Sequence, residues 1–388
     1  MTGARLVDLL FSVGARRKPK GWVAWVVPPF AFAIAVWVIY AAIIAIIDPW
    51  TLTSTFFGAM VTLVFLSVAP TQNYDEDKLP VVDLLLAACA LGCGIYFAFR
   101  ADYVVTRIAL LDELTTWDLL FGTLAFALTL EATRRTTGLG LLVIVLIFVA
   151  YNFLGHLLPG AIGHGYIDYN HFIDIMVYTT DGIMGLPLRV AATYAFLFVM
   201  FGSVLATVGG SEFFFNVAAA ASGRSPGGPA KIAVVSSGLY GTISGSPTAD
   251  VVTTGSVTIP MMRRLGYSGS LAGAVEVAAS TGGSVLPPVM GSAAFIMAEY
   301  IGVEYREIAF AAILPALLYY TGVYSQVHFR SLRLGLRGLD PDKIPRLGPT
   351  LREGGLFFVP LVVLTVALLL GYSPNFVAIV GTISVIAA

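Results

Sequence analysis

The sequence predicts an all-α, polytopic integral membrane protein with about ten membrane spans and one re-entrant hairpin. Of its 388 residues, 57% are hydrophobic and only 12% are charged, about half the charged fraction of an average soluble domain. The apolar residues also gather into runs of about twenty, the length of helix that crosses ~30 Å of hydrocarbon. Segments of alternating polarity, which are typical of a transmembrane β-barrel, do not occur.

The apolar runs give the expected order of helices. A basic stretch precedes the first run, which at about 26 residues is too long for the core of a signal peptide and indicates a retained helix. That stretch contains Arg5, Arg16, Arg17, Lys18 and Lys20. The runs are 22–47, 51–69, 80–99, 117–133, 138–158, 190–210, 232–262, 268–300, 306–329, 354–372 and 374–388.

The basic residues predict the topology, because Lys and Arg are enriched in cytoplasmic loops. With the N-terminus in the cytoplasm, all but four of the 22 Lys and Arg residues lie inside; the four are Arg100, Arg107, Arg189 and Arg306. This bias holds only if the segment 232–262 begins and ends on the same side. Its roughly thirty residues are too few for two full spans. We therefore predict a hairpin that enters the membrane and returns.

The middle of this segment predicts the hairpin tip at Ser244-Gly245-Ser246-Pro247. Ser246 is suited to cap a second half-helix, with Pro247 at its first position. Glycines in the first half would let the two half-helices approach closely, although ordinary small-residue packing explains them as well; they are Gly238, Gly241 and Gly245. Packing does not explain Asp250, because acids within the membrane are costly and usually functional.

The following segment, 268–300, predicts a discontinuous helix. Its centre holds Gly282 and Gly283, then Pro287 and Pro288, and two prolines remove two helix N–H donors. In transporters such breaks bind cations with carbonyl oxygens and anions with helix N-termini. Glu276 lies about one turn before the break and is either a proton-sensitive group or part of a polar network.

Together these two segments resemble the membrane component of tripartite ATP-independent periplasmic (TRAP) transporters. The stretch ISGSPTADVVTTGSVTIPMMRRLGYSGSLAGAVEVAASTGGSVLPP is similar to the family's first hairpin and first discontinuous helix. The variants SPTAD and VLPPVMG look most like fused permeases that work with TAXI-type binding proteins. The similarity is dense over residues 223–330. The helices within 22–158 are similar, with less specific motifs, to the small-subunit portion of such fusions.

The resemblance implies the first half of an inverted-repeat, elevator-type transporter in the bacterial inner membrane. It implies Na⁺-coupled import of small organic anions, for which we expect carboxylates, delivered by a periplasmic TAXI-type binding protein. The sequence has no Gly-x-x-x-x-Gly-Lys-Ser/Thr motif, which agrees with ion coupling. We expect no enzymatic activity and no cofactor other than the coupling ion Na⁺. We expect the chain to contact the lipid bilayer and no nucleic acid.

The expected domains are a cytoplasmic basic N-terminus (1–21), a small-subunit-like portion (22–158), a periplasmic loop (159–189) and the first repeat of the large permease (190–388). The resemblance also implies a second, inverted repeat. After the discontinuous helix the sequence holds no second Pro-Pro break or second hairpin tip, so we expect that repeat in a further part of the same chain or in a separate chain.

With the family pattern in hand, the two breaks predict the site residues. We expect Na⁺ to be bound by carbonyls and hydroxyls of Ser244, Gly245, Ser246, Thr281, Gly282 and Gly283. We expect the substrate to contact Ser246, Pro247, Thr248, Asp250, Ser284, Pro287 and Pro288. Asp250 would position the hairpin or supply negative charge, and the two prolines would hold the break open.

Three other functions are compatible with parts of the sequence. A sodium–carboxylate symporter that needs no binding protein fits the hairpin equally well, although the N-terminal helices favour the TRAP type. An intramembrane enzyme would use Asp250 and Glu276, but the four histidines lie elsewhere. A membrane scaffold would not need polar breaks at the bilayer centre.

The outer loop carries weaker signals. The stretch GHGYIDYNHFID contains His164, Asp168, His171 and Asp174, whose spacing could hold a metal. An interfacial amphipathic helix explains its alternating apolar and polar residues better. For the charged residues around Arg100 and Arg107 we expect a solvated loop, with contact to substrate or partner as the alternative.

Overall fold

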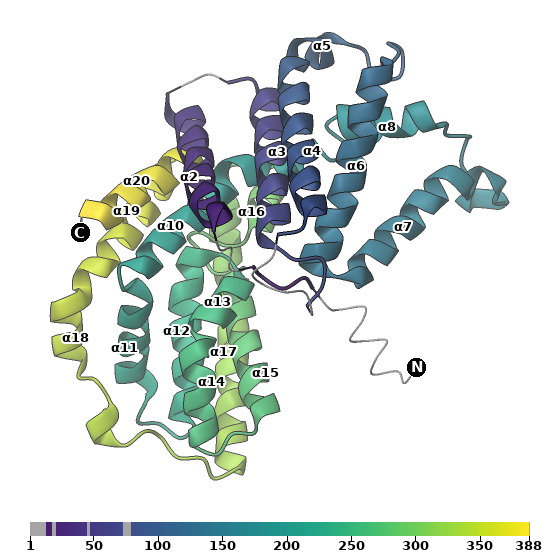
Figure 1. Cartoon of the computed structure of the whole chain (residues 1–388). Helices are drawn as coiled ribbons and strands as arrows, with labels where there is room; N and C mark the ends of the chain where they lie inside the picture. Colours follow the sequence, from purple (N-terminus) through teal and green to yellow (C-terminus); the bar gives the residue numbers. More distant parts are fainter. Residues whose placement is uncertain (1–12, 18–20, 45–46, 73–78, 388) are drawn as a thin grey trace. The chain divides into compact units, whose positions relative to one another are not determined.

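A computed structural model describes residues 13–17, 21–44, 47–72 and 79–387 (Figure 1). Within these residues the regular structure is helical, and β-pairing is limited to one isolated bridge between Arg16 and Val68. The predicted all-α class is confirmed. Three of the expected N-terminal basic residues lie outside the described residues: Arg5, Lys18 and Lys20.

Among the described residues, seven helices are long and apolar enough to cross a membrane. They are Val23–Ile43, Pro49–Ser67, Val81–Phe99, Leu139–Leu157, Leu186–Thr207, Tyr305–Arg333 and Leu347–Leu369. Two predicted segments form shorter apolar helices, Ser292–Ile301 and Pro374–Ala387. The predicted run 117–133 is helical too, but it carries charged residues near both ends. These lengths and compositions show a multi-pass membrane protein.

The chain divides into two compact units, residues 1–192 and 193–388. The first contains α2 (Trp22–Ile43), α3 (Pro49–Ser67), α4 (Val81–Phe99), α5 (Ala101–Thr106), α6 (Thr116–Thr137), α7 (Leu139–Leu154), α8 (Tyr169–Tyr178) and α9 (Leu186–Val190). Its core lies between α3, α4, α6 and α8. A Cβ at Gly58 of α3 would lie 2.7 Å from the Cα of Gly94 in α4, so small residues allow these two backbones to meet.

The second unit contains the predicted hairpin and broken helix. After a short π-helical segment at Ala191–Ala195 come α10 (Phe196–Thr207), α11 (Gly210–Ser222), α12 (Gly228–Ser244), α13 (Pro247–Thr253), α14 (Gly255–Arg264), α15 (Gly269–Gly283), α16 (Ser292–Ile301), α17 (Tyr305–Arg333), α18 (Leu347–Gly354), α19 (Phe358–Leu369) and α20 (Pro374–Ala387). Helix α12 is buried along nearly its whole length, among α11, α14, α15 and α17 (Figure 1). The first arm of the hairpin therefore packs inside protein, whereas Val252 and Val257 of the second arm are exposed.

The helices that were not predicted include α11 and α18. Residues 211–231 were expected to form an inside loop, but α11 occupies Gly210–Ser222 and buries Phe213 and Phe214 against its neighbours. Helix α18 likewise precedes the expected start of the span at 354. Both are short and amphipathic, and such helices lack the long apolar run on which the prediction of spans depended.

The outer loop does form the predicted amphipathic helix, α8 (Tyr169–Tyr178). Its apolar residues Phe172, Ile173 and Val177 pack into the core of the first unit beside α6. The expectation of a helix is confirmed, but these residues lie in the protein core and not at a lipid interface. The reason is that α6 presents Gly122 here, where a Cβ would lie 2.7 Å from the Ile173 side chain.

Candidate functional site

The first arm of the hairpin ends where the sequence predicted a tip. Helix α12 stops at Ser244, and Gly245 follows in the left-handed conformation with φ of 57°, which glycine adopts at little cost. Ser246 caps the next helix by accepting a hydrogen bond from the Ala249 N–H, and Pro247 stands at the first helical position. The predicted tip and its cap are confirmed.

The discontinuous helix is broken between Gly283 and Ser292. The intervening turn is closed by two contacts: Ser284 Oγ donates to the Thr281 carbonyl at 2.8 Å, and the Gly291 N–H donates to the Ser284 carbonyl at 2.8 Å. The two prolines lie in this turn, in half-buried positions. Helix α16 then begins at Ser292, so one half-helix ends and another begins within the same short segment.

The hairpin tip and the break touch each other. The Val289 N–H in the break donates to the Thr242 carbonyl of α12 at 3.2 Å. A Cβ at Gly245 would lie 1.9 Å from the Met290 carbonyl oxygen. The two polar breaks that the sequence singled out therefore form one continuous site within the second unit.

The hairpin glycines serve the expected contact in part and a second one as well. They were expected to bring the two half-helices of the hairpin together, and a Cβ at Gly241 would lie 3.0 Å from Asp250 Oδ2 in the second half-helix. The same Cβ would lie 2.5 Å from the Cα of Gly283 in α15. Gly238 faces the Tyr320 ring of α17 and Gly245 faces the break. The glycines thus allow the hairpin to approach the discontinuous helix, and the C-terminal ends of α12 and α15 lie together.

Asp250 is fully buried beside this crossing. Its Oδ1 accepts a hydrogen bond from Ser244 Oγ, whereas its Oδ2 has no hydrogen-bond partner among the described residues. The Oδ2 atom would lie 2.8 Å from a Cβ at Gly283, so the glycine leaves room for the carboxylate. A buried carboxylate oxygen without a donor is costly unless a proton or a cation accompanies it.

Glu276 is the second buried acid, and hydroxyl groups surround it. Thr254 Oγ1 donates to its Oε1 at 2.5 Å and Ser237 Oγ donates to the same atom at 3.1 Å. Thr258 Oγ1 donates to Oε2, and Ser280 Oγ lies 3.4 Å from Oε1. Glu276 is therefore part of a polar network, which is one of the two roles expected for it. That network ties α12, α14 and α15 together.

The other predicted site residues vary in exposure and bonding. Thr248 is exposed, whereas Gly282 and Gly283 are buried. The Thr281 hydroxyl donates to the Val277 carbonyl of its own helix at 2.7 Å. No described residue donates a hydrogen bond to the Gly245 carbonyl. The assignment of these residues to Na⁺ or to substrate stays a prediction.

Three tyrosines at the site were missed. Tyr305, buried and stacked on Phe295 at 4.3 Å, donates its hydroxyl to the Val289 carbonyl of the break. Tyr319 and Tyr320 of α17 donate to the Ala278 and Ala279 carbonyls of α15, at 2.7 and 3.0 Å. The only signal in the sequence was the Tyr-Tyr pair within an apolar span. Its partners lie 41 residues away, which no local pattern reveals.

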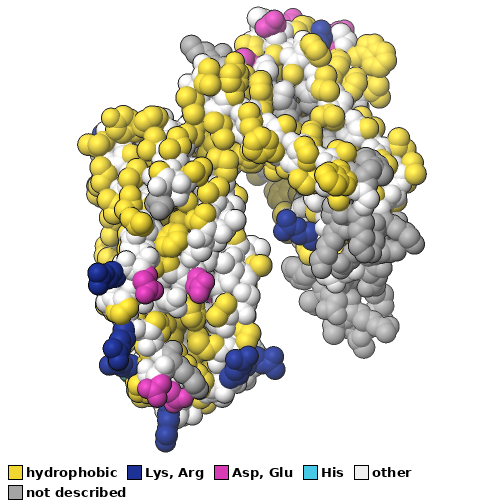
Figure 2. Space-filling model, turned by 60° about the vertical axis from the view of Figure 1, so that its left-hand side comes forward, with side chains coloured by type: hydrophobic (Ala, Val, Ile, Leu, Met, Phe, Trp, Pro, Cys, Tyr) yellow, Lys and Arg dark blue, Asp and Glu magenta, His cyan; other side chains and the backbone are white. Residues whose placement is uncertain are grey.

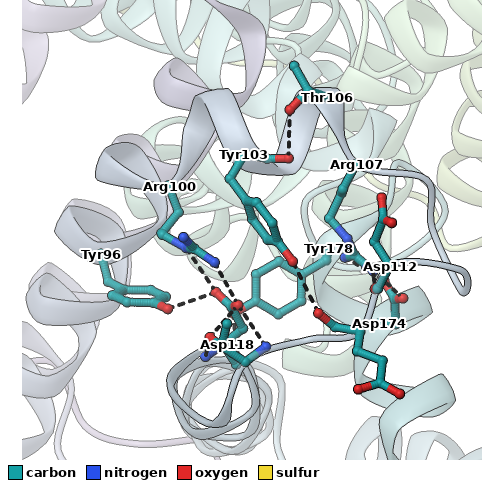
Figure 3. A network of polar contacts seen from close by, with 11 residues as sticks. Tyr96, Arg100, Tyr103, Thr106, Arg107, Asp112, Asp118, Asp174 and Tyr178 are labelled. Carbon is teal, nitrogen blue, oxygen red and sulfur yellow. Dashed lines mark hydrogen bonds and ion pairs between the residues drawn. The ribbon is translucent and has the colours of Figure 1, made fainter.

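A separate polar network lies at one end of the first unit, where α4, α5, α6 and α8 meet (Figure 3). Arg100 binds Asp118 at 2.9 Å, and Tyr96 donates to the same carboxylate at 2.7 Å. Arg107 pairs with Asp174, and this pair is nearly inaccessible to solvent. The expectation of a solvated loop is therefore wrong for Arg107, because its charge is neutralised by an aspartate 67 residues away.

The metal reading of the outer loop receives no support from the described residues, which contain no group of three potential His, Cys, Asp or Glu ligands. Asp168 caps α8 by accepting from the His171 N–H at 2.7 Å. Both ring nitrogens of His164 lie within hydrogen-bond distance of backbone carbonyls, Nε2 of Tyr151 and Nδ1 of Gly165. These carbonyls, Tyr151 first, raise the pKa of His164 above its usual value.

Comparison with known proteins agrees with this architecture. Over 153 residues the chain is 28% identical to the C4-dicarboxylate TRAP transporter large permease protein DctM of Pseudomonas aeruginosa. The aligned residues make up 38% of this chain and 35% of that protein. Over 121 residues it is 31% identical to an uncharacterized protein, YgiK, of Salmonella typhimurium. These aligned residues make up 31% of this chain and 28% of that protein. The chain thus spans about a third of the length of these curated relatives.

The family match is longer and includes both breaks. Residues 124–388 match the family described as tripartite ATP-independent periplasmic transporter, DctM component. The matched region takes in the hairpin, the discontinuous helix, Asp250 and Glu276, together with part of the first unit. With its two broken segments joined in one polar site inside a multi-pass helical fold, the chain belongs to this family of TRAP transporter large permeases.

Proposed function

We propose that this chain forms part of a Na⁺-coupled importer of small organic anions in the bacterial inner membrane, with its N-terminus in the cytoplasm. Secondary transport follows from membership of the permease family. The same membership makes this chain a transporter component and not an enzyme, so Asp250 and Glu276 act on ions or on the structure and not in catalysis.

The single observation that carries the Na⁺ proposal is the crossing of α12 and α15 next to Asp250. Two half-helices end there, at Ser244 and Gly283, and the C-terminal end of a helix carries partial negative charge. The carboxylate adds an Oδ2 atom without a hydrogen-bond donor. Carbonyls, hydroxyls and a carboxylate are the ligands that hard cations prefer, so these groups favour a small monovalent cation.

The substrate would bind on the opposite side of the same break. Helix α16 begins at Ser292, and the first N–H groups of a helix attract anions. The hairpin tip adjoins this region, since the Gly245 carbonyl oxygen would lie 3.4 Å from a Cβ at Gly291, and Ser246 and Thr248 of the tip would add hydroxyl donors. A relative that is named as a C4-dicarboxylate permease supports carboxylates as the substrate class.

The partners in this proposal are a periplasmic binding protein of the TAXI type and a second repeat, in the same chain or another. Delivery by a soluble protein agrees with family membership. Movement of the hairpin and the broken helices as an elevator would then carry the site across the membrane. A binding-protein-independent symporter would use the same ion site and differ only in delivery.

Reconstituted transport tests this proposal. The transporter that contains this chain would be placed in proteoliposomes and given labelled organic acids, with and without a Na⁺ gradient and with and without its binding protein. We expect uptake only when both are present. Uptake with Na⁺ alone would replace the tripartite proposal by the simple symporter, and uptake indifferent to Na⁺ would overturn the ion coupling.

The ion site has its own test in the same assay. Asp250→Asn keeps the volume of the side chain and removes its charge, so we expect the half-saturating Na⁺ concentration to rise at least tenfold. Asp102→Asn, in an exposed outer position, serves as the matched control and should leave Na⁺ dependence unchanged. If Asp250→Asn and Thr281→Val both left Na⁺-dependent uptake intact, the ion-site assignment would be wrong.

A further inference from the structure

A groove of about 570 Å³ lies between α15 and α17 in the second unit, away from the ion site. Its walls include Leu271, Val275 and Ala278 of α15, and Val323 and Phe329 of α17. At one end it is lined by two arginines, Arg330 and Arg333. The groove thus combines apolar walls with positive charge at a single end.

The two arginines face no counter-charge. None of the residues that line the groove is acidic, and among the described residues neither guanidinium takes part in an ion pair. Both side chains are exposed. The charges are therefore available to an anion that arrives from outside this chain.

The length of the groove matches one leaflet of a bilayer. Its α17 wall runs from Val323 to Arg333, which at 1.5 Å per residue is about 15 Å. The hydrocarbon core of a bilayer is about 30 Å thick. An acyl chain that follows α17 from the arginines would therefore end near the bilayer centre.

The arginines also lie on the side where anionic lipids bind such pockets. The distribution of Lys and Arg places this end of α17 in the cytoplasm. Basic pockets between membrane helices on that side bind anionic lipid head groups. Figure 2 shows a largely hydrophobic surface on the second unit, with Lys and Arg side chains, and acidic side chains among them, toward its lower part.

We propose that this groove is a binding site for an anionic phospholipid, with the phosphate held by Arg330 and Arg333 and an acyl chain between α15 and α17. The site is independent of the Na⁺ and substrate proposals, because it shares no residue with them. Bound lipid would fix α15, the helix that carries Glu276 and ends at the break, against α17.

Native mass spectrometry and thermal unfolding of the purified transporter test the site, with phosphatidylglycerol, phosphatidylcholine and inorganic phosphate as probes. We expect phosphatidylglycerol to be retained and to raise the unfolding temperature, and the other two to do neither. Equal retention of both lipids would overturn the role of charge. Inorganic phosphate binding as tightly as the lipid would replace the lipid site by a free-anion site.

Three variants separate the parts of the site. Arg330→Gln combined with Arg333→Gln should weaken phosphatidylglycerol binding at least tenfold. Arg337→Gln is the matched control, since it removes an exposed charge from the loop that follows α17, at a residue that does not line the groove, and it should change binding less than twofold. Ala274→Phe, at an exposed position in the groove, should block the acyl chain while both arginines remain.

Each variant can contradict the proposed lipid site. If Arg337→Gln weakened binding as much as the double variant, the lipid would be held by general surface charge and the proposal would fail. It would fail equally if Ala274→Phe left binding unchanged, or if a co-purifying polypeptide shielded the groove. Circular dichroism and gel filtration would confirm that each variant is folded before binding is compared.

Discussion

Gly283 and Gly273 lie on the same helix, α15, but an added methyl group would meet very different surroundings. At Gly283 it would lie 2.7 Å from the Gly241 Cα and 2.8 Å from Asp250 Oδ2; at Gly273 nothing lies within 4 Å. Overpacking of this kind costs about 1–3 kcal/mol. We expect Gly283→Ala to lower the unfolding temperature of the purified protein and to weaken Na⁺ binding.

The control for this substitution is Gly273→Ala, which should leave stability equal or raise it by up to about 1 kcal/mol through helix propensity. Equal destabilisation by both variants would mean that glycine in α15 matters for flexibility and not for the close crossing with α12.

Glu276 offers a second test at the level of one atom. Thr258 supplies the hydrogen bond to its Oε2, within the described residues, and both side chains are buried. Thr258→Val keeps the shape but leaves that oxygen without its donor, which costs about 1–3 kcal/mol. Chemical denaturation would measure the loss. Thr321→Val, at an exposed position of α17, should stay within about 0.5 kcal/mol, and a similar loss there would argue against the network.

At the scale of elements, the contact between hairpin tip and break depends on Gly245. Gly245→Ala would place a Cβ 1.9 Å from the Met290 carbonyl oxygen and would force a side chain into a positive φ of 57°. Gly302→Ala would also force a side chain into a positive φ, here 72°, but no other atom would lie within 4 Å of its Cβ. The strain of a left-handed residue is about 1–2 kcal/mol.

We therefore expect Gly302→Ala to lower stability modestly and to preserve uptake, whereas Gly245→Ala lowers stability further and abolishes uptake. Thermal unfolding and transport in proteoliposomes would be compared on the same preparations. If the two variants behaved alike, backbone strain would explain both, and the tip would not need its close contact with the break.

These elements also show how much the sequence could predict. The tip at Ser244–Pro247 and the break before Ser292 were predictable because serine, glycine and proline interrupt apolar helices by local backbone chemistry. The sequence did not predict which residue each glycine contacts. Gly241 contacts Gly283, and this pairing depends on tertiary packing. Short amphipathic helices such as α11 were missed because their apolar face is complete only within the fold.

The site was predictable to a similar extent. Asp250 stood out because a carboxylate in an apolar segment is rare. The Thr- and Ser-rich hairpin segment, with Thr254, was equally unusual in an apolar run, but nothing local shows that Thr254 and Thr258 donate to Glu276 on another helix. Tyr305 shows the same limit, since an aromatic residue in an apolar span gives no sign that it binds a carbonyl in another segment.

At the scale of a whole unit, the first unit is held at one end by the buried pair of Arg107 and Asp174, whose side chains are 1% and 5% exposed. Removing one partner of a buried pair costs about 3–5 kcal/mol. Arg107→Gln should therefore destabilise the first unit by an amount readily seen in chemical denaturation. Arg306→Gln breaks an exposed pair, which is worth about 0–1 kcal/mol; a comparable loss would contradict the role of burial.

The topology of the whole chain follows from one structural claim, that α12 to α14 enter the membrane and return. Positions before and after the hairpin should then lie on the same, cytoplasmic side. Single cysteines in place of exposed Arg224 and Arg264, in a background without Cys89 and Cys93, should resist a membrane-impermeant maleimide in intact cells and react after permeabilisation. Cysteines in place of Asp102 and Glu304, both exposed and expected outside, should react in intact cells. Opposite labelling of positions 224 and 264 would mean that the segment crosses the membrane once, and the ion site would lose the hairpin on which it rests.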